Sequence, residues 1–340
     1  MDSVSQIALG AAVGVAVMGR RTAPWRAAAW GAMAGTLPDL DVLIDYGDPV
    51  LDMVRHRAET HALFWLTLFS LPFAAAVARL QGQWAQWRRW WLALWAALVT
   101  HPLLDAFTVY GTQIGLPFSD HPVGVASVFI IDPAYTLPLL VGTGIALAAG
   151  RRGWAWRANA AGLALSTAYL AWGVAAQAHV QHIAAASLAA QGLPAERVLV
   201  TPTAFNSIAW RVVAMGQEHY LEGFYSLLDA RPTIAFDRFD RGAALEAELR
   251  AQQRDVPALD RIARFSRGFY ALRQEGSRVL LTDLRMGQEP AYIFSFAIAE
   301  RASPPQPLAL PVQVGSRPDL ARWLPWLVRR IGGRAEPPPR

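Results

Sequence analysis

Residues 100–119 read Thr-His-Pro-Leu-Leu-Asp-Ala-Phe-Thr-Val-Tyr-Gly-Thr-Gln-Ile-Gly-Leu-Pro-Phe-Ser and follow the apolar run Trp90–Val99. On a continuing helix, His101 and Asp105 stand four residues apart and share one face. An Asp at the centre of a membrane helix costs roughly 2.5–3.5 kcal/mol on insertion scales. A bound cation would compensate this cost, so the stretch predicts half of a metal site. The alternative is a hydrogen bond between the two side chains in helix packing.

The composition of the chain is typical of a membrane protein. Of its 340 residues, 54% are hydrophobic and 17% are charged, and the mean hydropathy is +0.22. Cys is absent, which excludes thiolate zinc sites and disulfides and leaves His and carboxylate as metal ligands. The net charge of +5 comes mostly from short arginine clusters, not from a basic face with interleaved aromatics, so we expect no nucleic-acid partner. We expect no cleavable signal peptide, because Asp2 precedes the first apolar run.

Apolar segments bounded by arginines fill the first half of the chain. They are Ile7–Met18, Ala27–Leu37, Ala62–Leu80, Trp90–Tyr110, Val123–Gly150 and Ala158–Ala178. The positive-inside rule places three arginine clusters in the cytoplasm, namely Arg20/Arg21/Arg26, Arg79/Arg88/Arg89 and Arg151/Arg152/Arg157. Residues 38–61 and 101–122 then meet on the outer side. We therefore expect a polytopic helical membrane domain over residues 1–180, with the lipid bilayer as its partner. In a bacterial cell the outer side would be the periplasm.

The composition changes near residue 195, where alternating and β-branched stretches begin. Strands are expected at Val198–Pro202, Trp210–Met215, His219–Leu228, Thr233–Phe239, Gly268–Leu272, Arg278–Leu284 and Tyr292–Ala299, and helices at Ala243–Gln253 and Ala258–Phe265. Residues 195–302 thus predict a small extramembrane α+β domain, periplasmic under the same topology, after a mainly α first domain. Residues 303–340 are expected to form a Pro-rich tail, containing Pro304–Pro311 and an amphipathic helix at 318–331.

Two carboxylates follow Pro38 in the segment that the topology places beside His101 and Asp105. Asp39 and Asp41 lie on the same side of an extended backbone, or within one turn if Pro38 starts a helix. Either geometry brings two potential ligands to the outer face. A solvated interfacial turn with a capping Asp is the alternative.

Two histidines follow in the same segment. His56 and His61 are five residues apart, so they do not share a helical face. They converge if Glu59 or Thr60 starts the next helix and His56 lies in the loop before it. Each histidine taken alone also fits an ordinary interfacial position.

The predicted metal ligands share one membrane face and are Asp39, Asp41, His56, His61, His101 and Asp105. Imidazole and carboxylate together suit Zn best, with Mn or Mg as alternatives. Such an ion lowers the pKa of a bound water and polarises a carbonyl or phosphoryl group. Glu59 is our candidate for the catalytic base, and Asp132 is a weaker one.

Three motifs, in this order, resemble those of the membrane-bound metal-dependent hydrolases, the YdjM-like inner-membrane hydrolases of bacteria. They are Leu37-Pro38-Asp39-Leu40-Asp41, then His56-Arg57 with Thr60-His61, then His101-Pro102-Leu103-Leu104-Asp105-Ala106-Phe107-Thr108 with Tyr110-Gly111-Thr112-Gln113 and Pro117-Phe118-Ser119. The resemblance covers roughly residues 1–140. Residues Arg197–Arg301 resemble the C-terminal region of one branch of that family.

The resemblance implies a polytopic membrane hydrolase whose ion is bound by these Asp and His residues. It also implies a distant kinship with zinc phospholipases C and related zinc nucleases, which place His and Asp ligands on a helical scaffold. One departure concerns the N-terminal region. Many members carry a His where this chain has Ser5-Gln6-Ile7-Ala8, so this site is expected to lack one ligand or to bind a single ion.

The function predicted from these observations is metal-assisted hydrolysis of an ester or phosphoester, with a lipid-like substrate favoured by the position of the site. Two other classes of protein stay open. In an ion or solute transporter the His and Asp residues would form a relay. In a non-catalytic membrane scaffold the outer domain would bind a partner, and the His and Asp residues would tolerate substitution.

Overall fold

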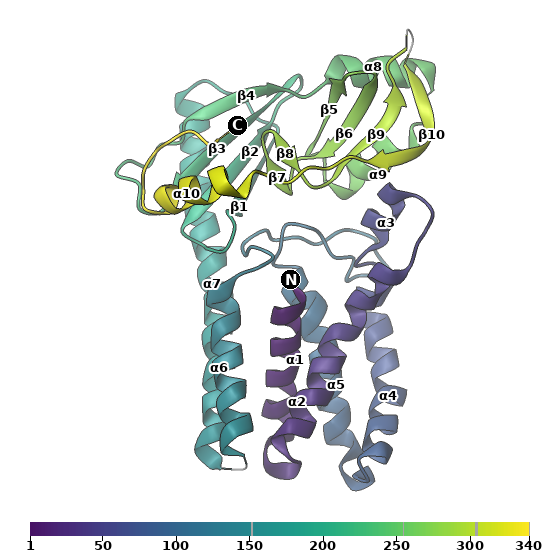
Figure 1. Cartoon of the computed structure of the whole chain (residues 1–340), viewed down its shortest axis with the longest axis vertical. Coiled ribbons are helices and arrows are strands. Elements are labelled where there is room, and N and C mark those ends of the chain that lie inside the picture. Colours follow the sequence, from purple (N-terminus) through teal and green to yellow (C-terminus); the bar gives the residue numbers. More distant parts are fainter. Residues whose placement is uncertain (151, 254, 303–304, 340) are drawn as a thin grey trace. The chain divides into compact units, whose positions relative to one another are not determined.

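The computed structural model describes residues 1–150, 152–253, 255–302 and 305–339 (Figure 1). The chain folds into two compact units, which we describe separately. The helical unit comprises Met1–Ile44, His56–Val174 and Ala204–Asn206. The sheet unit comprises Asp45–Arg55, Ala175–Thr203 and Ser207–Arg340. The predicted order, a helix-rich N-terminal region followed by a β-sheet domain, is confirmed.

Long helices form the helical unit. They are α1 (Ser3–Met18), α2 (Pro24–Thr36), α4 (Leu63–Leu80), α5 (Trp87–Asp105), α6 (Pro133–Ala149) and the part of α7 (Gly153–Ala190) up to Val174. Short 3₁₀ turns lie between them, namely η1 (Gly19–Arg21), η2 (Leu37–Leu43), η3 (Glu59–His61) and η4 (Trp84–Gln86). The α1–α2 and α4–α5 connections and the facing ends of α6 and α7 lie at the same end of this unit (Figure 1). The described arginines of the three clusters therefore gather there, namely Arg20, Arg21, Arg26, Arg79, Arg88, Arg89, Arg152 and Arg157.

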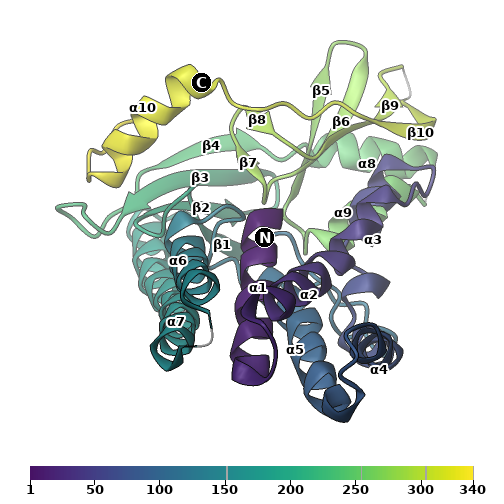
Figure 2. The same cartoon turned by 60° about the horizontal axis from the view of Figure 1, so that its bottom comes forward.

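Helix α1 lies at the centre of the unit and packs against α2, α5 and α6 (Figure 2). Its contact with α2 is made by glycines spaced four residues apart. A Cβ atom on Gly10 would stand 2.3 Å from the carbonyl oxygen of Gly31, and a Cβ on Gly31 would stand 2.2 Å from that of Gly10. Gly14 and Gly35 extend the same contact by one turn in each direction. The two backbones therefore touch directly, which is the small-residue packing of membrane helices.

Helices α5 and α4 differ in how much of their apolar surface is buried. In α5, the side chains of Trp90, Leu94 and Leu98 are fully buried. Helix α4 instead exposes a run of large apolar side chains that begins at Phe64. Among the residues that the structure describes, two helical segments are long and apolar enough to cross a membrane, Ser3–Arg21 and Leu63–Leu80.

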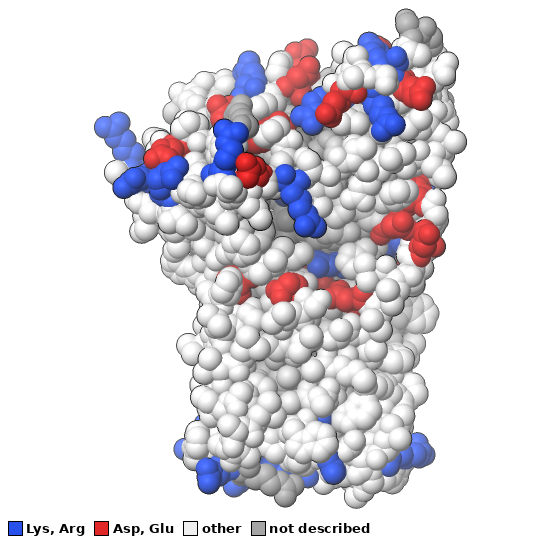
Figure 3. Space-filling view, in the orientation of Figure 1, with Lys and Arg blue, Asp and Glu red and all other residues white. Residues whose placement is uncertain are grey.

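The surface of the helical unit is charged near its ends and uncharged between them. In Figure 3, a broad belt on the visible face shows no Lys, Arg, Asp or Glu side chains, and arginines border the belt at the end that carries the helix turns. A belt of this kind is typical of a surface that contacts lipid.

One apolar segment is shorter than its sequence predicts. The apolar run Val123–Gly150 forms helix only from Pro133, and the residues before it form an irregular loop. Pro133 occupies the first turn of α6, and the side chain of Asp132 accepts a hydrogen bond from the backbone of Ala134 at 3.0 Å. A capping Asp followed by Pro fixes a helix start, whatever the hydropathy of the residues before it.

The sheet unit contains two four-stranded antiparallel sheets with strand orders β1-β2-β3-β4 and β10-β9-β6-β5, and a short β7-β8 pair. The strands are β1 (Arg197–Pro202), β2 (Ala209–Met215), β3 (His219–Ser226), β4 (Phe236–Asp240), β5 (Tyr270–Glu275), β6 (Arg278–Asp283), β7 (Gly287–Gln288), β8 (Ala291–Tyr292), β9 (Ser295–Glu300) and β10 (Gln306–Gln313). Its helices are α3 (Pro49–Arg55), α8 (Ala243–Gln252), α9 (Pro257–Phe265), α10 (Leu320–Ile331) and the end of α7.

Helices cover the sheets. From Ala176 to Ala184, α7 packs on a core that includes Trp210 and Tyr225. Trp326 of α10 packs edge-on against Phe224 of β3, with ring centroids 5.0 Å apart. The predicted amphipathic helix at 318–331 is thus present.

Two segments differ from the sequence-based expectation. The sequence predicts a tail over residues 303–340, of which 303, 304 and 340 lie outside the described residues, whereas Gln306–Gln313 pair with β9 as an edge strand. An edge strand tolerates Pro307 and Pro311, because one side of it needs no backbone donors. The polar segment before His56 contains α3, and Asp48 there forms a 2.6 Å ion pair with Arg261 of α9. The hydropathy of the segment gives no sign of this packing.

We predict that Gly31→Ala lowers the stability of the protein by about 1–3 kcal/mol, because the new methyl group overlaps a backbone carbonyl that cannot move alone. Gly144→Ala in α6 is the matched control, since a Cβ there meets nothing within 4 Å. Thermal unfolding of both variants in detergent measures the difference. Equal midpoints for the two variants would contradict the direct contact between α1 and α2.

Candidate metal centre

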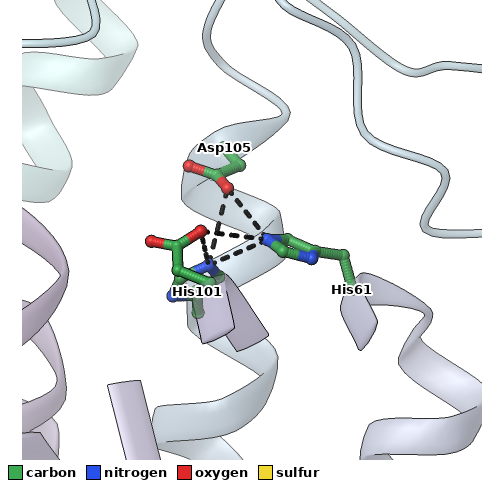
Figure 4. A group of neighbouring side chains, drawn as sticks. His61, His101 and Asp105 are labelled. Atoms are coloured by element: carbon green, nitrogen blue, oxygen red, sulfur yellow. Dashed lines mark hydrogen bonds and ion pairs between the residues drawn. The ribbon is translucent and has the colours of Figure 1, made fainter. Parts of the chain in front are cut away.

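Three elements bring His and Asp side chains together at the end of the helical unit opposite the arginine clusters. Helix α5 carries His101 and Asp105 in its last turns, η3 carries His61, and η2 carries Asp39. Figure 4 shows His61 and His101 pointing toward each other, with Asp105 beside them. Pro38 lies in the first turn of η2, so the second of the two backbone geometries considered for Asp39 and Asp41 is the one observed.

One atom from each of four residues, Asp39, His61, His101 and Asp105, lies within 4.8 Å of the other three. The Nε2 atoms of His61 and His101 are 3.1 Å apart. Asp39 Oδ1 lies 3.4 Å from each of these nitrogens. Asp105 Oδ2 lies 3.4 Å from Nε2 of His61 and 3.5 Å from that of His101. The four atoms therefore surround one point.

These separations fit a tetrahedral metal site. With bonds of about 2.0–2.2 Å, the ligand atoms around Zn²⁺ are about 3.3–3.6 Å from one another. The distances given above, between 3.1 and 3.5 Å, are close to that range. Asp39 Oδ1 and Asp105 Oδ2 are also buried, and no hydrogen-bond donor among the described residues is aligned with either. A cation would satisfy both oxygens, which are otherwise costly to bury.

The hydrogen bond of His101 fixes which of its nitrogens faces the centre. Its Nδ1 lies 2.6 Å from the carbonyl oxygen of Gly35. A carbonyl only accepts hydrogen bonds, so Nδ1 carries the proton and Nε2 presents its lone pair to the other three residues. Metal-binding histidines are usually held in this way.

His61 is oriented by a two-step relay. Its Nδ1 lies 2.9 Å from Thr60 Oγ1, which donates its own proton to Asp41 Oδ2 at 2.7 Å. The hydroxyl therefore accepts from Nδ1, and Nε2 of His61 is again left without a proton when the ring is neutral. Both imidazoles thus direct a lone pair at the same point.

Asp41 and His56, which the sequence suggests as ligands, lie outside the group of four. His56 Nδ1 donates to Asp41 Oδ1 at 2.8 Å, and the backbone N–H of Arg57 donates to Asp41 Oδ2 at 3.0 Å. Both Asp41 oxygens are therefore engaged in holding the neighbouring turns. The ring of His56 is partly exposed, whereas those of His61 and His101 are buried.

The other oxygen of Asp105 accepts hydrogen bonds from two sides. Gln6 Nε2 donates to it at 3.0 Å and also donates to the carbonyl of His101 at 3.2 Å. The amino group of Met1 contacts the same oxygen. Gln6 thus lies in the centre, at the position where many relatives are expected to carry His, and there it donates hydrogen bonds to Asp105 and His101.

Arg57 supplies a buried positive charge. Its Nε lies 3.2 Å from Asp105 Oδ2 without the alignment of a hydrogen bond, and its Nη1 donates to Thr108 Oγ1 at 3.2 Å. The guanidinium also lies over the ring of Tyr110, 4.9 Å from its centroid. Arg57 therefore positions the ligand Asp105 and balances part of the carboxylate charge.

The two candidate bases predicted from the sequence, Glu59 and Asp132, lie outside the group of four. Glu59 is exposed at the start of η3 and is not one of the four residues. Asp132 caps α6 and accepts a hydrogen bond from Tyr169 at 2.8 Å. Sequence reasoning did not assign roles to Arg57 and Thr60, although both lie inside the motif that contains His56 and His61. The role of the Gly35 carbonyl cannot be read from the sequence, because every residue type has a backbone carbonyl.

The cluster shifts the protonation of its members. Burial alone raises the pKa of Asp39, but the imidazoles of His101 and His61 outweigh it and hold the pKa well below its usual range. The pKa of Asp41 is lowered in the same way by His56 and His61. Burial lowers the pKa of His61, but its carboxylate neighbours outweigh burial and raise the pKa to about 9.

Comparison with known proteins gives one family and one curated relative. A family model described as YdjM inner membrane protein matches residues 1–180. The uncharacterized protein YfhP of Bacillus subtilis (strain 168) is 28% identical over 159 residues, which cover 45% of this chain and 48% of the relative. The chain thus spans about half the length of this relative. No solved structure matches the chain.

We predict that divalent cations bind this group more tightly as the pH rises toward 9. Below a pKa of about 9 the ring of His61 carries a proton that a metal must displace, so apparent affinity should increase by up to about tenfold per pH unit. Competition with a chelator at about pH 7 and about pH 8 measures the change. An affinity that is the same at both values would contradict the protonation of His61.

Proposed function

Because the chain belongs to the YdjM inner membrane protein family, we propose that it is a membrane-bound metal-dependent hydrolase. Its ion is held by Asp39, His61, His101 and Asp105. The observation that carries this proposal is the convergence of two imidazole nitrogens and two carboxylate oxygens at tetrahedral spacing, with no hydrogen-bond donor among the described residues aligned with either oxygen. Two imidazoles and two carboxylates suit Zn best, and Mn or Mg less well.

A bound divalent ion would supply Lewis acidity and a water of lowered pKa. The chain's own residues hold the ligands and move the proton. Thr60 and Asp41 keep Nε2 of His61 free for the ion, and the carbonyl of Gly35 does the same for His101. Arg57 and Gln6 fix the carboxylate of Asp105. In this arrangement Asp41 supports the ligands instead of binding the ion itself.

Two side chains are placed to accept a proton from the attacking water. Glu59 is exposed on the same turn as His61, which keeps it as our candidate base. His56 is a second candidate, because Asp41 holds its Nδ1 at 2.8 Å while the ring is partly exposed. A base of this kind needs an orienting partner and access to solvent, and His56 has both.

The proposed substrate is an ester or phosphoester of a lipid-like molecule. The arginine clusters at one end of the helical unit support a cytoplasmic location for that end under the positive-inside rule, and the proposed ligands lie at the other end. We therefore propose a multi-pass inner-membrane protein whose site and C-terminal domain face the periplasm. A transporter is less well supported, because the four ligand atoms gather at one end of α5 instead of along it.

We predict that the purified protein carries near-stoichiometric Zn or Mn, and that His101→Ala and Asp105→Ala lose it. Each variant removes one of four convergent ligands, and loss of any one lowers affinity steeply. His121→Ala is the control, because His121 is exposed and is not one of the four. Elemental analysis decides the matter, and a well-folded preparation without metal would refute the proposal. A hydrolysis screen with lipids and phosphoesters then tests the reaction.

Thr60→Val is expected to lower metal affinity by about 10–100-fold, because it breaks the relay that orients His61. Thr60→Ser keeps the hydroxyl and is expected to bind as the natural protein does. Chelator competition on the two variants, compared at one pH, separates orientation from packing. Weaker binding by Thr60→Ser with unchanged binding by Thr60→Val would show that the methyl group matters and the hydroxyl does not.

A further inference from the structure

The turn that carries Asp39 exposes apolar side chains on its outer side. Leu40, Val42 and Leu43 are 49%, 71% and 78% exposed, although they alternate with Asp39 and the buried Asp41. Large apolar groups are rarely left in water so close together, because their burial is favourable by about 25 cal/mol per Å². An exposed apolar patch of this kind marks an interaction surface.

A second group of exposed apolar side chains lies beside η3, where α4 begins. Phe118 is 82% exposed and packs edge-on against Phe64, with ring centroids 5.5 Å apart. Phe64 in turn packs against Trp65 at 4.9 Å. The backbone N–H of Leu63 donates to the carbonyl of Ile114 at 3.2 Å, which ties this loop to the start of the helix.

This aromatic group continues into the apolar surface of α4. Beyond Trp65, the helix exposes Leu68, Phe69 and Leu71, and it is long and apolar enough to cross a membrane. The surface that α4 turns to lipid therefore runs without a charged side chain of its own to the start of the helix, next to η3 and its ligand His61. Aromatic rings at such a helix end mark the boundary between hydrocarbon and headgroups.

We propose that six of the exposed apolar residues on η2, at the start of α4 and in the loop beside it form an apolar rim. This rim inserts into the acyl-chain region of the bilayer beside the metal centre. The rim consists of Leu40, Val42, Leu43, Phe64, Trp65 and Phe118. Its occupant is the hydrocarbon of membrane lipid. A centre bordered in this way stands at headgroup level, where the ester and phosphoester bonds of a lipid lie. The assignment of a bilayer lipid as substrate rests on the proposed hydrolase function, but the insertion of the rim does not.

The chain contains no Cys, so a single introduced cysteine carries a fluorophore at one known position. Leu43→Cys and Phe118→Cys report on the two halves of the rim, and His121→Cys, in the same loop as Phe118 and also exposed, is the matched control. The full chain is reconstituted into vesicles of phosphatidylethanolamine and phosphatidylglycerol. The vesicles carry a nitroxide quencher either on the acyl chains or on the headgroups.

For both rim positions we expect about twofold or greater quenching by acyl-chain nitroxide relative to headgroup nitroxide, as for an apolar face buried below the headgroups. The His121 label should show the reverse. If a rim variant loses the elution profile of the natural protein, Val42→Cys replaces Leu43→Cys and Trp65→Cys replaces Phe118→Cys. Quenching of the rim labels by aqueous iodide to the same extent as the His121 label would overturn the proposal. Rim labels shielded from every quencher would also overturn it, because protein would then cover the rim. Because quenching needs neither metal nor substrate, this result is independent of metal content and of hydrolysis.

Discussion

The hydrogen bond from His101 Nδ1 to the carbonyl of Gly35 joins the packing of the bundle to the chemistry of the centre. Gly35 reaches this position because α1 and α2 touch through Gly10 and Gly31, where any side chain would separate the helices. The same carbonyl belongs to the last turn of α2, just before η2 presents Asp39. A shift of α2 would therefore disturb the tautomer of one ligand and the place of another at once.

Charge balance supports the proposed divalent ion. The side chains of Asp39, Asp41 and Asp105 carry three negative charges, since the pKa values of Asp39 and Asp41 are held low. Arg57 supplies one positive charge beside Asp105. Two negative charges remain among these side chains, with the amino group of Met1 beside Asp105, and the proposed divalent cation would neutralise them. In its absence a proton on His61 provides part of that charge, which is the cause of its raised pKa.

The sequence predicts the parts of the centre whose geometry is local. His101 and Asp105 share a helix face because their spacing is four, and the order of the apolar segments brings the polar loops to one end. The roles of Asp39 and Asp41 depend on the backbone conformation of η2 and on residues far away in the sequence. An extended backbone would aim both at one place, but in the 3₁₀ turn η2 Asp39 lies on the Nε2 side of the His61 ring and Asp41 on its Nδ1 side. One becomes a candidate ligand and the other a support.

Two further features, a glycine pattern and an edge strand, can be read in the sequence only when the segment that packs against each of them is known. The spacing of Gly10 with Gly14 and of Gly31 with Gly35 is a packing signal for membrane helices. Nothing in either helix alone says that the two meet. The edge strand Gln306–Gln313 also cannot be recognised from its own sequence, because its prolines disfavour a strand. They are tolerated here because the strand pairs with β9 on one side and its other side needs no backbone donors.

The seven residues of η2 must satisfy two opposed requirements. Asp39 and Asp41 face a polar interior of histidines, while Leu40, Val42 and Leu43 face outward. A charged group is cheapest near the membrane surface and apolar groups are cheapest below it, so a turn that carries both is stable only where these regions meet. The proposed metal centre would therefore stand at the depth of lipid headgroups for a physical reason that is separate from catalysis. Hydrolysis of a lipid bond would use a position that the turn already needs for its own stability.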